Sequence, residues 1–330
     1  MKPLSRHLPD CSLLIAALAT VLLAYPRESK AQAEGRVDVT PAAQLFYHIE
    51  GTGADTIVVL HGGPAFGYGY MAPNLAALGR RHVLIYYDQR GAGRSTLDTI
   101  TAHLTIEQHV EDLDQLRRAF KLQAVTLLGH SWGGMLAAQY AIAHPSLTRR
   151  VILVDPMTPA QALRNLPAQT PLPVDSATLQ RVSALFGRIA DAPDPLATCR
   201  ELFSPELIYR LYFADSTSAS RFQGDFCARP VEALRASNVV VQRTMMGLGP
   251  DFDVRQALST VLAPVLVLRG MRGAIAREAM VAWTRGFKNA RLVEVAGAGH
   301  YLWVDQPDAF LAAVEAFLVG GWPKEAITPE

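Results

Sequence analysis

Three short motifs in the 330-residue chain combine residue types that could carry out acyl transfer, and the first contains Ser131. It reads Gly129-His-Ser-Trp-Gly133, a G-x-S-x-G pattern between an apolar run that predicts a strand and an alanine-rich run that predicts a helix. Glycine at both ends lets the backbone turn sharply and expose the serine hydroxyl above a sheet. We interpret Ser131 as a nucleophile; the alternative is a glycine-rich turn whose serine caps the next helix.

A serine hydroxyl is a weak nucleophile at neutral pH and needs a base whose pKa lies near the working pH. His300 ends the run Ala296-Gly-Ala-Gly-His300, follows the last predicted strand and comes after Ser131 in the chain. Of the nine histidines, we therefore assign His300 as the general base. The others, including His61 and His130, are predicted to be structural.

The third motif, Val59-Leu-His-Gly-Gly-Pro64, also follows a predicted strand. Acyl transfer passes through a tetrahedral oxyanion, and backbone N–H groups on a glycine-rich loop can approach that charge without obstruction by side chains. We expect the N–H groups of Gly63 and Trp132 to form this oxyanion hole. A tight turn that merely requires small residues is the alternative.

Taken together, the motifs resemble the proline iminopeptidase family of α/β-hydrolases. The resemblance extends in order and spacing from about Leu45 to Phe317 and rests on His61-Gly-Gly-Pro64, Asp88-Gln-Arg-Gly-Ala-Gly-Arg-Ser95, Gly129-His-Ser-Trp-Gly-Gly134 and Gly299-His300. It implies a serine hydrolase that cleaves small substrates, often at an N-terminal residue, beneath a helical cap and without a metal or organic cofactor. Sequences with the same motifs include esterases and other amidases, so a carboxylesterase is the alternative.

The chain departs from this family at the triad acid. The resemblance implies a Gly-x-x-Asp pattern after the penultimate strand, but Gly270-Met-Arg-Gly273 has glycine where the aspartate should be. In trypsin, replacing the acid by its amide costs about 10⁴ in kcat, because the acid orients the base and stabilises its charged form. The acid of this chain therefore has to come from elsewhere, or the chain has lost its activity.

Three accounts of the acid are open. In the first, it is Asp155, which follows the apolar run 151–154; the other role for this residue is to cap the chain before Pro156. In the second, a carboxylate such as Glu278 or Asp251, a water molecule or a backbone carbonyl takes its place. In the third, the protein is a non-catalytic ligand-binding protein on a hydrolase fold.

The resemblance also implies how a substrate is held. In aminopeptidases of the family, carboxylates of the lid bind the free amine of the substrate. The lid segment of this chain contains several acidic residues, of which we take Glu201 and Glu232 as the substrate-binding candidates. Glu206 and Asp225 are the remaining possibilities.

Such a site needs a rigid sheet to position it. Short β-branched runs alternate with helical patterns, which predicts an α/β fold with a mostly parallel, doubly wound sheet. The predicted strands are 45–50, at the edge, and 56–60, 82–87, 124–128, 150–154, 264–269 and 290–295; the predicted helices include 106–120, 135–143 and 309–318. The alternation breaks over 156–250, a stretch too long for an ordinary loop, which we interpret as an inserted helical lid. The core is thus predicted over 34–155 and 251–330.

Composition limits the partners of the chain. The formal net charge is +1, with 31 basic and 30 acidic side chains, so no strong field favours nucleic acid or an anionic membrane. A small-molecule or short-peptide substrate is therefore expected, and the sequence indicates no oligomeric state. Cys199 and Cys227 lie in the predicted lid and either form a disulfide or remain as buried thiols.

The N-terminus has the pattern of a targeting segment. Lys2 and Arg6 precede an almost wholly apolar run, 13–23, and Ala31-Gln-Ala33 fits a cleavage site with small residues. Residues 1–33 are therefore predicted to be a signal peptide, and the mature protein to be periplasmic or secreted and free of the membrane. An uncleaved anchor is the alternative, although the apolar run is shorter than the ~20 residues that span a bilayer.

Overall fold

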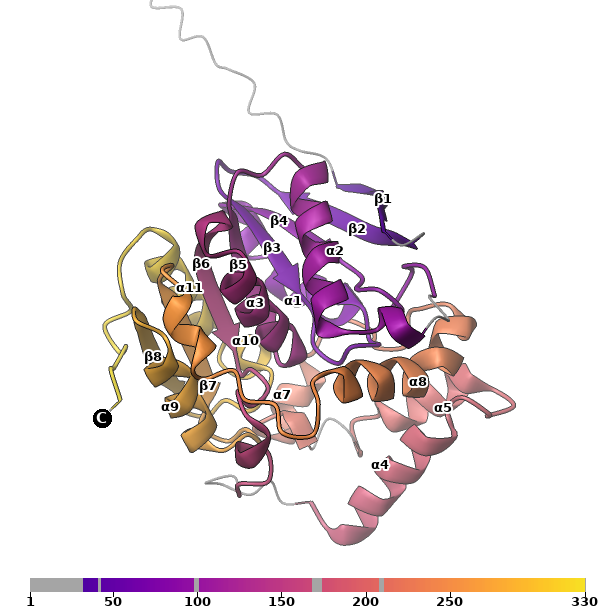
Figure 1. Ribbon diagram of the computed structural model, residues 1–330. Coiled ribbons are helices and arrows are strands. Elements are labelled where there is room, and N and C mark those ends of the chain that lie inside the picture. Colours follow the sequence, from indigo (N-terminus) through magenta and orange to yellow (C-terminus); the bar gives the residue numbers. More distant parts are fainter. Residues whose placement is uncertain (1–31, 41–42, 98–100, 168–173, 208–210, 330) are drawn as a thin grey trace, which may run out of the picture.

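The computed structural model describes residues 32–40, 43–97, 101–167, 174–207 and 211–329. At its centre lies a sheet of eight strands in the order β1-β2-β4-β3-β5-β6-β7-β8 (Figure 1). β2 pairs antiparallel with β1 and β4, whereas all pairs from β4 to β8 are parallel. The strands are β1 (Ala33–Val39), β2 (Ala43–Gly51), β3 (Thr56–Leu60), β4 (Val83–Tyr87), β5 (Val125–His130), β6 (Thr148–Val154), β7 (Val265–Gly270) and β8 (Ala290–Val295). The predicted mostly parallel α/β sheet is confirmed.

The central strands are apolar throughout because helices cover both faces of the sheet. In β6, Ile152 and Val154 pack into one hydrophobic cluster, while Val151 and Leu153 pack into another. Alternate residues of a strand point to opposite faces, so the two clusters lie on the two sides of the sheet. The cluster of Val151 contains residues of α2 (Ile106–Ala119), α3 (Trp132–Ala143) and α9 (Arg277–Gly286); the other contains residues of α1 (Ala72–Leu75), α10 (Leu302–Asp305) and α11 (Pro307–Leu318).

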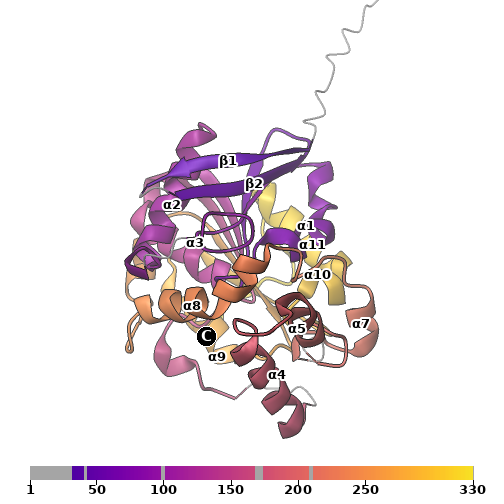
Figure 2. The ribbon, with the colours of Figure 1, turned by 90° about the vertical axis from the view of Figure 1, so that its right-hand side faces the viewer.

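The insertion between β6 and β7 is helical and gathers beyond one end of the sheet (Figures 1 and 2). Its helices are α4 (Ser176–Arg188), α5 (Pro195–Leu202), α7 (Ser216–Ser220) and α8 (Val231–Gly247). Three of them begin at an aspartate whose side chain accepts a hydrogen bond from a backbone N–H in the first turn: Asp175, Asp194 and Asp215. Cys199 in α5 and Cys227 in the loop before α8 form a disulfide.

The N-terminal part of the chain adds a strand that the sequence analysis missed. Of the predicted signal peptide, residues 1–31 lie outside the described residues, and Ala33 begins β1. β1 forms the edge of the sheet, so the prediction that 45–50 is the edge strand is wrong. Charged Glu34, Arg36 and Asp38 alternate along β1, a pattern that suits an edge but hides the strand from a search for apolar runs. No helix in the described part of the chain is long and apolar enough to cross a membrane.

The disulfide should stabilise the protein measurably. It closes a lid loop between cysteines 28 residues apart, and removing a crosslink of this span raises the entropy of the unfolded chain. The double variant Cys199→Ala/Cys227→Ala should therefore lose about 3 kcal/mol of unfolding free energy. Urea denaturation of the variant and the oxidised wild type measures the difference, and reduced wild-type protein is the control. Equal stability of variant and oxidised wild type contradicts this contribution.

Candidate active site

Four loops meet at one edge of the sheet because they follow the carboxyl ends of parallel strands. Gly63 follows β3, Ser131 follows β5, Asp155 follows β6, and His300 lies in the loop after β8. β3, β5 and β6 are adjacent in the sheet, and only β7 separates β6 from β8. Residues that are far apart in sequence are therefore collected above this edge.

Ser131 occupies a strained turn between β5 and α3, with φ 54° and ψ −118°. Its N–H donates to the carbonyl of Val154 at 3.0 Å, which ties the turn to the end of β6. A Cβ on Gly129 would lie 2.2 Å from the carbonyl oxygen of Gly133, and a Cβ on Gly133 would lie 2.2 Å from that of Leu60. Both glycines of the motif are thus required, because only without side chains can strand and helix approach closely enough to hold this turn.

The glycine-rich loop after β3 lies directly beside Ser131. A Cβ on Gly62 would come within 2.9 Å of the Cβ of Ser131. Gly63 has φ 51°, and its carbonyl accepts a hydrogen bond from Phe66 N–H at 2.9 Å, which closes a tight turn. Trp132 is the first residue of α3, where backbone N–H groups have no acceptor within the helix. The loop and the helix N-terminus therefore both border the serine.

Asp155 holds the imidazole of His300. The Nδ1–H of His300 donates to Oδ2 of the Asp155 carboxylate at 2.5 Å, and the carboxylate is completely buried. This bond fixes a proton on Nδ1 and leaves Nε2 as the nitrogen that can accept one. The other oxygen, Oδ1, is also buried and has no hydrogen-bond partner among the described residues. Asp155 itself adopts φ 39° and is anchored by its N–H, which donates to the carbonyl of Leu268 at 2.8 Å.

Gly273 lies beside this carboxylate. A Cβ placed on Gly273 would be 3.2 Å from Oδ2 of Asp155. The family pattern places the acid at position 273, after β7. The Asp155 carboxylate follows the neighbouring strand β6 and lies in the space next to that position. Of the other carboxylates considered, Glu278 lines a separate surface pocket and Asp251 is exposed.

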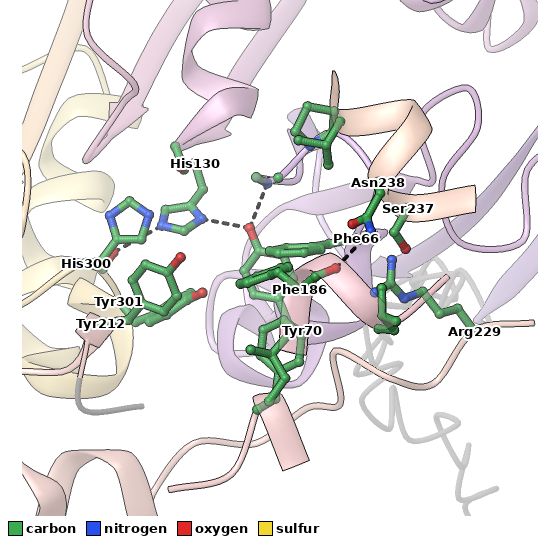
Figure 3. Close-up of a pocket in the computed structure, with 18 of the residues that line it drawn as sticks. Phe66, Tyr70, His130, Phe186, Tyr212, Arg229, Ser237, Asn238, His300 and Tyr301 are labelled. Atoms are coloured by element: carbon green, nitrogen blue, oxygen red, sulfur yellow. Dashed lines mark hydrogen bonds between the residues drawn. The ribbon is translucent and has the colours of Figure 1, made fainter. Parts of the chain in front are cut away.

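A chain of buried hydrogen bonds links three of these loops. The N–H of Gly62 donates to the hydroxyl of Tyr70 at 2.7 Å, and this hydroxyl donates to Nδ1 of His130 at 2.7 Å (Figure 3). On the other side of the ring, Nε2–H of His130 donates to the carbonyl of His300 at 3.1 Å. Burial lowers the pKa of His130 well below its usual range, so the ring is neutral and each nitrogen has the role that this chain requires.

His61 is held in a second buried network. The N–H of Gln89 donates to Nε2 of His61 at 3.0 Å, and the side-chain amide of Gln89 donates to the His61 carbonyl at 2.9 Å. The indole N–H of Trp132 donates to Oε1 of the same glutamine at 2.8 Å. Burial lowers the pKa of His61 to about 4, so this ring is neutral at physiological pH. The motifs recognised in the sequence thus contact one another and hold their loops together.

Ser131 and His300 both line a cavity of about 510 Å³ between the core and the lid. Much of its wall is apolar, formed by Pro64, Phe66, Phe186, Ile189, Leu202, Phe203 and Val241. None of the described residues that line it is acidic. Within the described ranges, no group of three or more histidine, cysteine, aspartate or glutamate side chains could hold a metal ion.

Neither glutamate predicted to bind the substrate reaches this cavity. Glu201 forms an ion pair with Arg181 at 2.7 Å and is 38% exposed, and Glu232 is exposed in the first turn of α8. The lid instead contributes Arg229, which the sequence analysis did not single out. A lone arginine before Pro230 has no local pattern, and only the docking of the lid shows which side chains face the core.

The comparison with known families agrees with this arrangement. Residues 55–307 match the family described as alpha/beta hydrolase fold. The chain belongs to this family.

Its relatives include enzymes of more than one activity. A proline iminopeptidase of Heyndrickxia coagulans is 27% identical over 297 residues, which cover 86% of this chain and 98% of the relative. The crystal structure of a proline iminopeptidase from Mycobacterium smegmatis is similar with a TM-score of 0.64 at 25% identity, and covers 87% of this chain and 98% of its own. A thermophilic esterase from Thermogutta terrifontis, at 22% identity with the same coverage, shares the fold with a TM-score of 0.62.

The hydroxyl of Tyr70 should be important for stability. Tyr70→Phe leaves the N–H of Gly62 and Nδ1 of His130 buried without a partner, so the free energy of unfolding should fall by about 2 kcal/mol. Tyr87→Phe is the matched control, because the Tyr87 hydroxyl is buried and has no hydrogen-bond partner within the described residues. Urea denaturation should therefore separate the two variants. The linking role of Tyr70 is refuted if both variants lose the same free energy.

Proposed function

We propose that the chain is an exported serine hydrolase that cleaves a small ester or amide through an acyl-enzyme. One observation carries the proposal: His300, whose Nδ1 is hydrogen-bonded to the buried Asp155, lines the same cavity as Ser131 and Gly63. A strained serine, a base with its partner acid and a glycine-rich loop at one cavity are the parts that acyl transfer needs. Membership of the hydrolase family supports this assignment.

In the proposed reaction, Nε2 of His300 takes the proton of the Ser131 hydroxyl while Oγ attacks the carbonyl carbon of the substrate. The N–H groups of Gly63 and Trp132 donate to the resulting oxyanion. His300 then passes the proton to the leaving oxygen or nitrogen as its bond to the carbonyl carbon breaks. Water attacks the acyl-enzyme in the same way, its proton passes through Nε2 back to Oγ, and the free acid leaves.

Asp155 would act on this cycle through His300. Each half of the reaction places a positive charge on the imidazole, and Nδ1 then faces a fully buried carboxylate at 2.5 Å. In a site with little water, the attraction between two such charges is much stronger than in solvent. The carboxylate therefore lowers the free energy of the state in which His300 holds the serine proton.

The lining of the cavity supports one of the two substrate classes considered from the sequence over the other. Similarity to proline iminopeptidases supports cleavage of an N-terminal residue. That reaction requires a group that binds the free amine of the substrate, and no acidic side chain lines the cavity among the described residues. We therefore place hydrolysis of an ester, or of an amide without a free amine, before the iminopeptidase reaction.

Export is a separate part of the proposal. The apolar run 13–23 and the small residues up to Ala33 support a signal peptide. The disulfide between Cys199 and Cys227 supports an oxidising destination such as the periplasm or the extracellular space.

A fluorophosphonate reagent separates an enzyme from a non-catalytic ligand-binding protein on the same fold. The reagent forms a covalent bond only with an activated serine, so the wild type should be labelled rapidly at Ser131 and Ser131→Ala should not be labelled at all. Mass spectrometry of the labelled peptide identifies the site. Ser95→Ala, which changes a buried serine of another turn, is the control and should be labelled like the wild type. Labelling that is absent from the wild type overturns the proposal.

A second experiment moves the acid from one strand to its neighbour. Asp155→Asn should lower kcat for 4-nitrophenyl acetate by roughly 10⁴-fold, as the equivalent change does in trypsin. Asp155→Ala/Gly273→Asp should recover part of the activity lost in Asp155→Ala, because the Cβ at position 273 lies 3.2 Å from where Oδ2 of Asp155 stands. Unchanged turnover in Asp155→Asn shows that the acid lies elsewhere.

A further inference from the structure

Arg229 provides a positive charge in the cavity. It follows Cys227 by two residues and precedes α8, and it lines the cavity together with Ser131 and His300. Figure 3 shows it beside Ser237 and Asn238, on the opposite side of the cavity from His300. The imidazole of His300 and the guanidinium of Arg229 therefore lie on opposite sides of one cavity.

Arg229 has no ion-pair partner within the described part of the chain. One of its terminal nitrogens, Nη1, donates to the carbonyl of Ala65, and the guanidinium lies over the ring of Phe66 at 5.6 Å from the centroid. Its Nε is buried and has no hydrogen-bond partner among the described residues. A buried donor on a charged group that lacks an acceptor is costly, so such a group is expected to meet an acceptor from a ligand.

The charge of Arg229 persists in this environment. Burial lowers its pKa to about 10, against the opposing effect of the Asp88 and Asp225 carboxylates, so the guanidinium remains protonated at neutral pH. The Asp88 carboxylate forms no ion pair with Arg229 among the described residues and accepts hydrogen bonds from the N–H groups of Tyr68 at 2.9 Å and of Arg94 at 2.7 Å. Asp225 accepts one from the N–H of Cys227 at 2.7 Å.

The neighbours of Arg229 do not supply the missing acceptor. Within the described residues, neither Ser237 nor Asn238 accepts a hydrogen bond from Nε of Arg229. Their donor groups are directed elsewhere, because the Ser237 hydroxyl donates to the Ala233 carbonyl at 3.0 Å and the Asn238 amide nitrogen donates to the Phe186 carbonyl at 2.8 Å. Between Arg229 and His300 the cavity wall is largely aromatic (Figure 3). A ligand that fits this pattern has an acceptor with negative charge at one end, an apolar middle and a carbonyl at the other end.

We propose that the natural substrate carries a carboxylate at the end remote from the scissile carbonyl, and that Arg229 binds this carboxylate. The inference rests on the proposed hydrolase function and specifies its substrate class. Arginine forms strong, charge-assisted hydrogen bonds with carboxylates, and the apolar wall removes competing water. The positive charge of Arg229 also disfavours binding of a substrate that carries a protonated amine at this end of the cavity. The bond to Ala65 further places Arg229 next to the glycine-rich loop that borders Ser131.

Matched pairs of esters test this proposal. The first series contains the mono-4-nitrophenyl esters of adipate, suberate and sebacate, each compared with the same compound whose free carboxylate is a methyl ester. A second series carries the carboxylate in the leaving alcohol. In one of the series, the wild type should prefer the free acid over its methyl ester by roughly tenfold or more in kcat/KM, chiefly through a lower KM.

Variants of Arg229 test whether this residue causes the preference for the free acid over its methyl ester. In Arg229→Gln the ratio of kcat/KM between the acid and its methyl ester should fall by about the same factor, and Arg229→Lys should retain part of it. Arg235→Gln is the matched control, because Arg235 is an exposed arginine of α8 that does not line the cavity. If Arg229 only tethers the lid to the loop at Ala65, both substrates slow together and the ratio stays constant, which overturns the proposal.

Binding to an inactive variant keeps this test independent of turnover. In Ser131→Ala, titration calorimetry should show tighter binding of suberate than of dimethyl suberate, and Arg229→Gln in this background should remove the difference. If Ser131-dependent hydrolysis occurs but neither the ratio nor the binding difference depends on Arg229, the substrate class is wrong and the hydrolase proposal stands. If Ser131 is neither labelled nor needed for hydrolysis, the hydrolase proposal itself fails, whatever Arg229 binds.

Discussion

A single hydrogen bond, from Nδ1 of His300 to Asp155, joins the end of β6 to the loop after β8. The surrounding sheet keeps these two side chains next to each other. The carboxylate is fully buried, and a buried charge is tolerated only when its surroundings fix a partner beside it. Here the sheet supplies that constraint. β6, β7 and β8 are adjacent and parallel, so their ends cannot drift apart without breaking the ladder of backbone hydrogen bonds between them.

The loops around this pair are fixed mainly by buried neutral groups. His61 and His130 are too deeply buried to carry charge, and each uses one ring nitrogen as donor and the other as acceptor. Through Tyr70 and Gln89 these rings connect the glycine-rich loop to the segment that holds the serine. Networks of this kind tolerate little displacement, since every member loses a hydrogen bond when one moves. The lid is attached to this rigid base and contributes Arg229, Ser237 and Asn238 to the cavity.

Features encoded by neighbouring residues in the sequence could be predicted, whereas features that depend on contacts between distant segments could not. The strands from β2 to β8, the lid and the turn at Ser131 are encoded by contiguous patterns and could be recognised from residue spacing, whereas the charged edge strand β1 could not. The sequence left Asp155 as one of three explanations for the missing triad acid. An aspartate before a proline is typical of an ordinary cap, and only the position of β6 beside β7 brings this residue to the catalytic loops. Glu201 was predicted to bind the substrate and Arg229 was not, because the side chains that the lid turns towards the core depend on how the lid docks and not on local sequence patterns.

The disulfide has a consequence for selectivity that goes beyond the stability of the lid. Cys227 lies two residues before Arg229, so the covalent bond to α5 anchors the segment that carries the guanidinium. In a reducing cytoplasm this anchor is absent, and the charged end of the cavity loses a fixed position relative to the serine. If the chain is an exported hydrolase and Arg229 selects its substrate, as proposed, this discrimination is acquired only after the protein has left the compartment in which it is made.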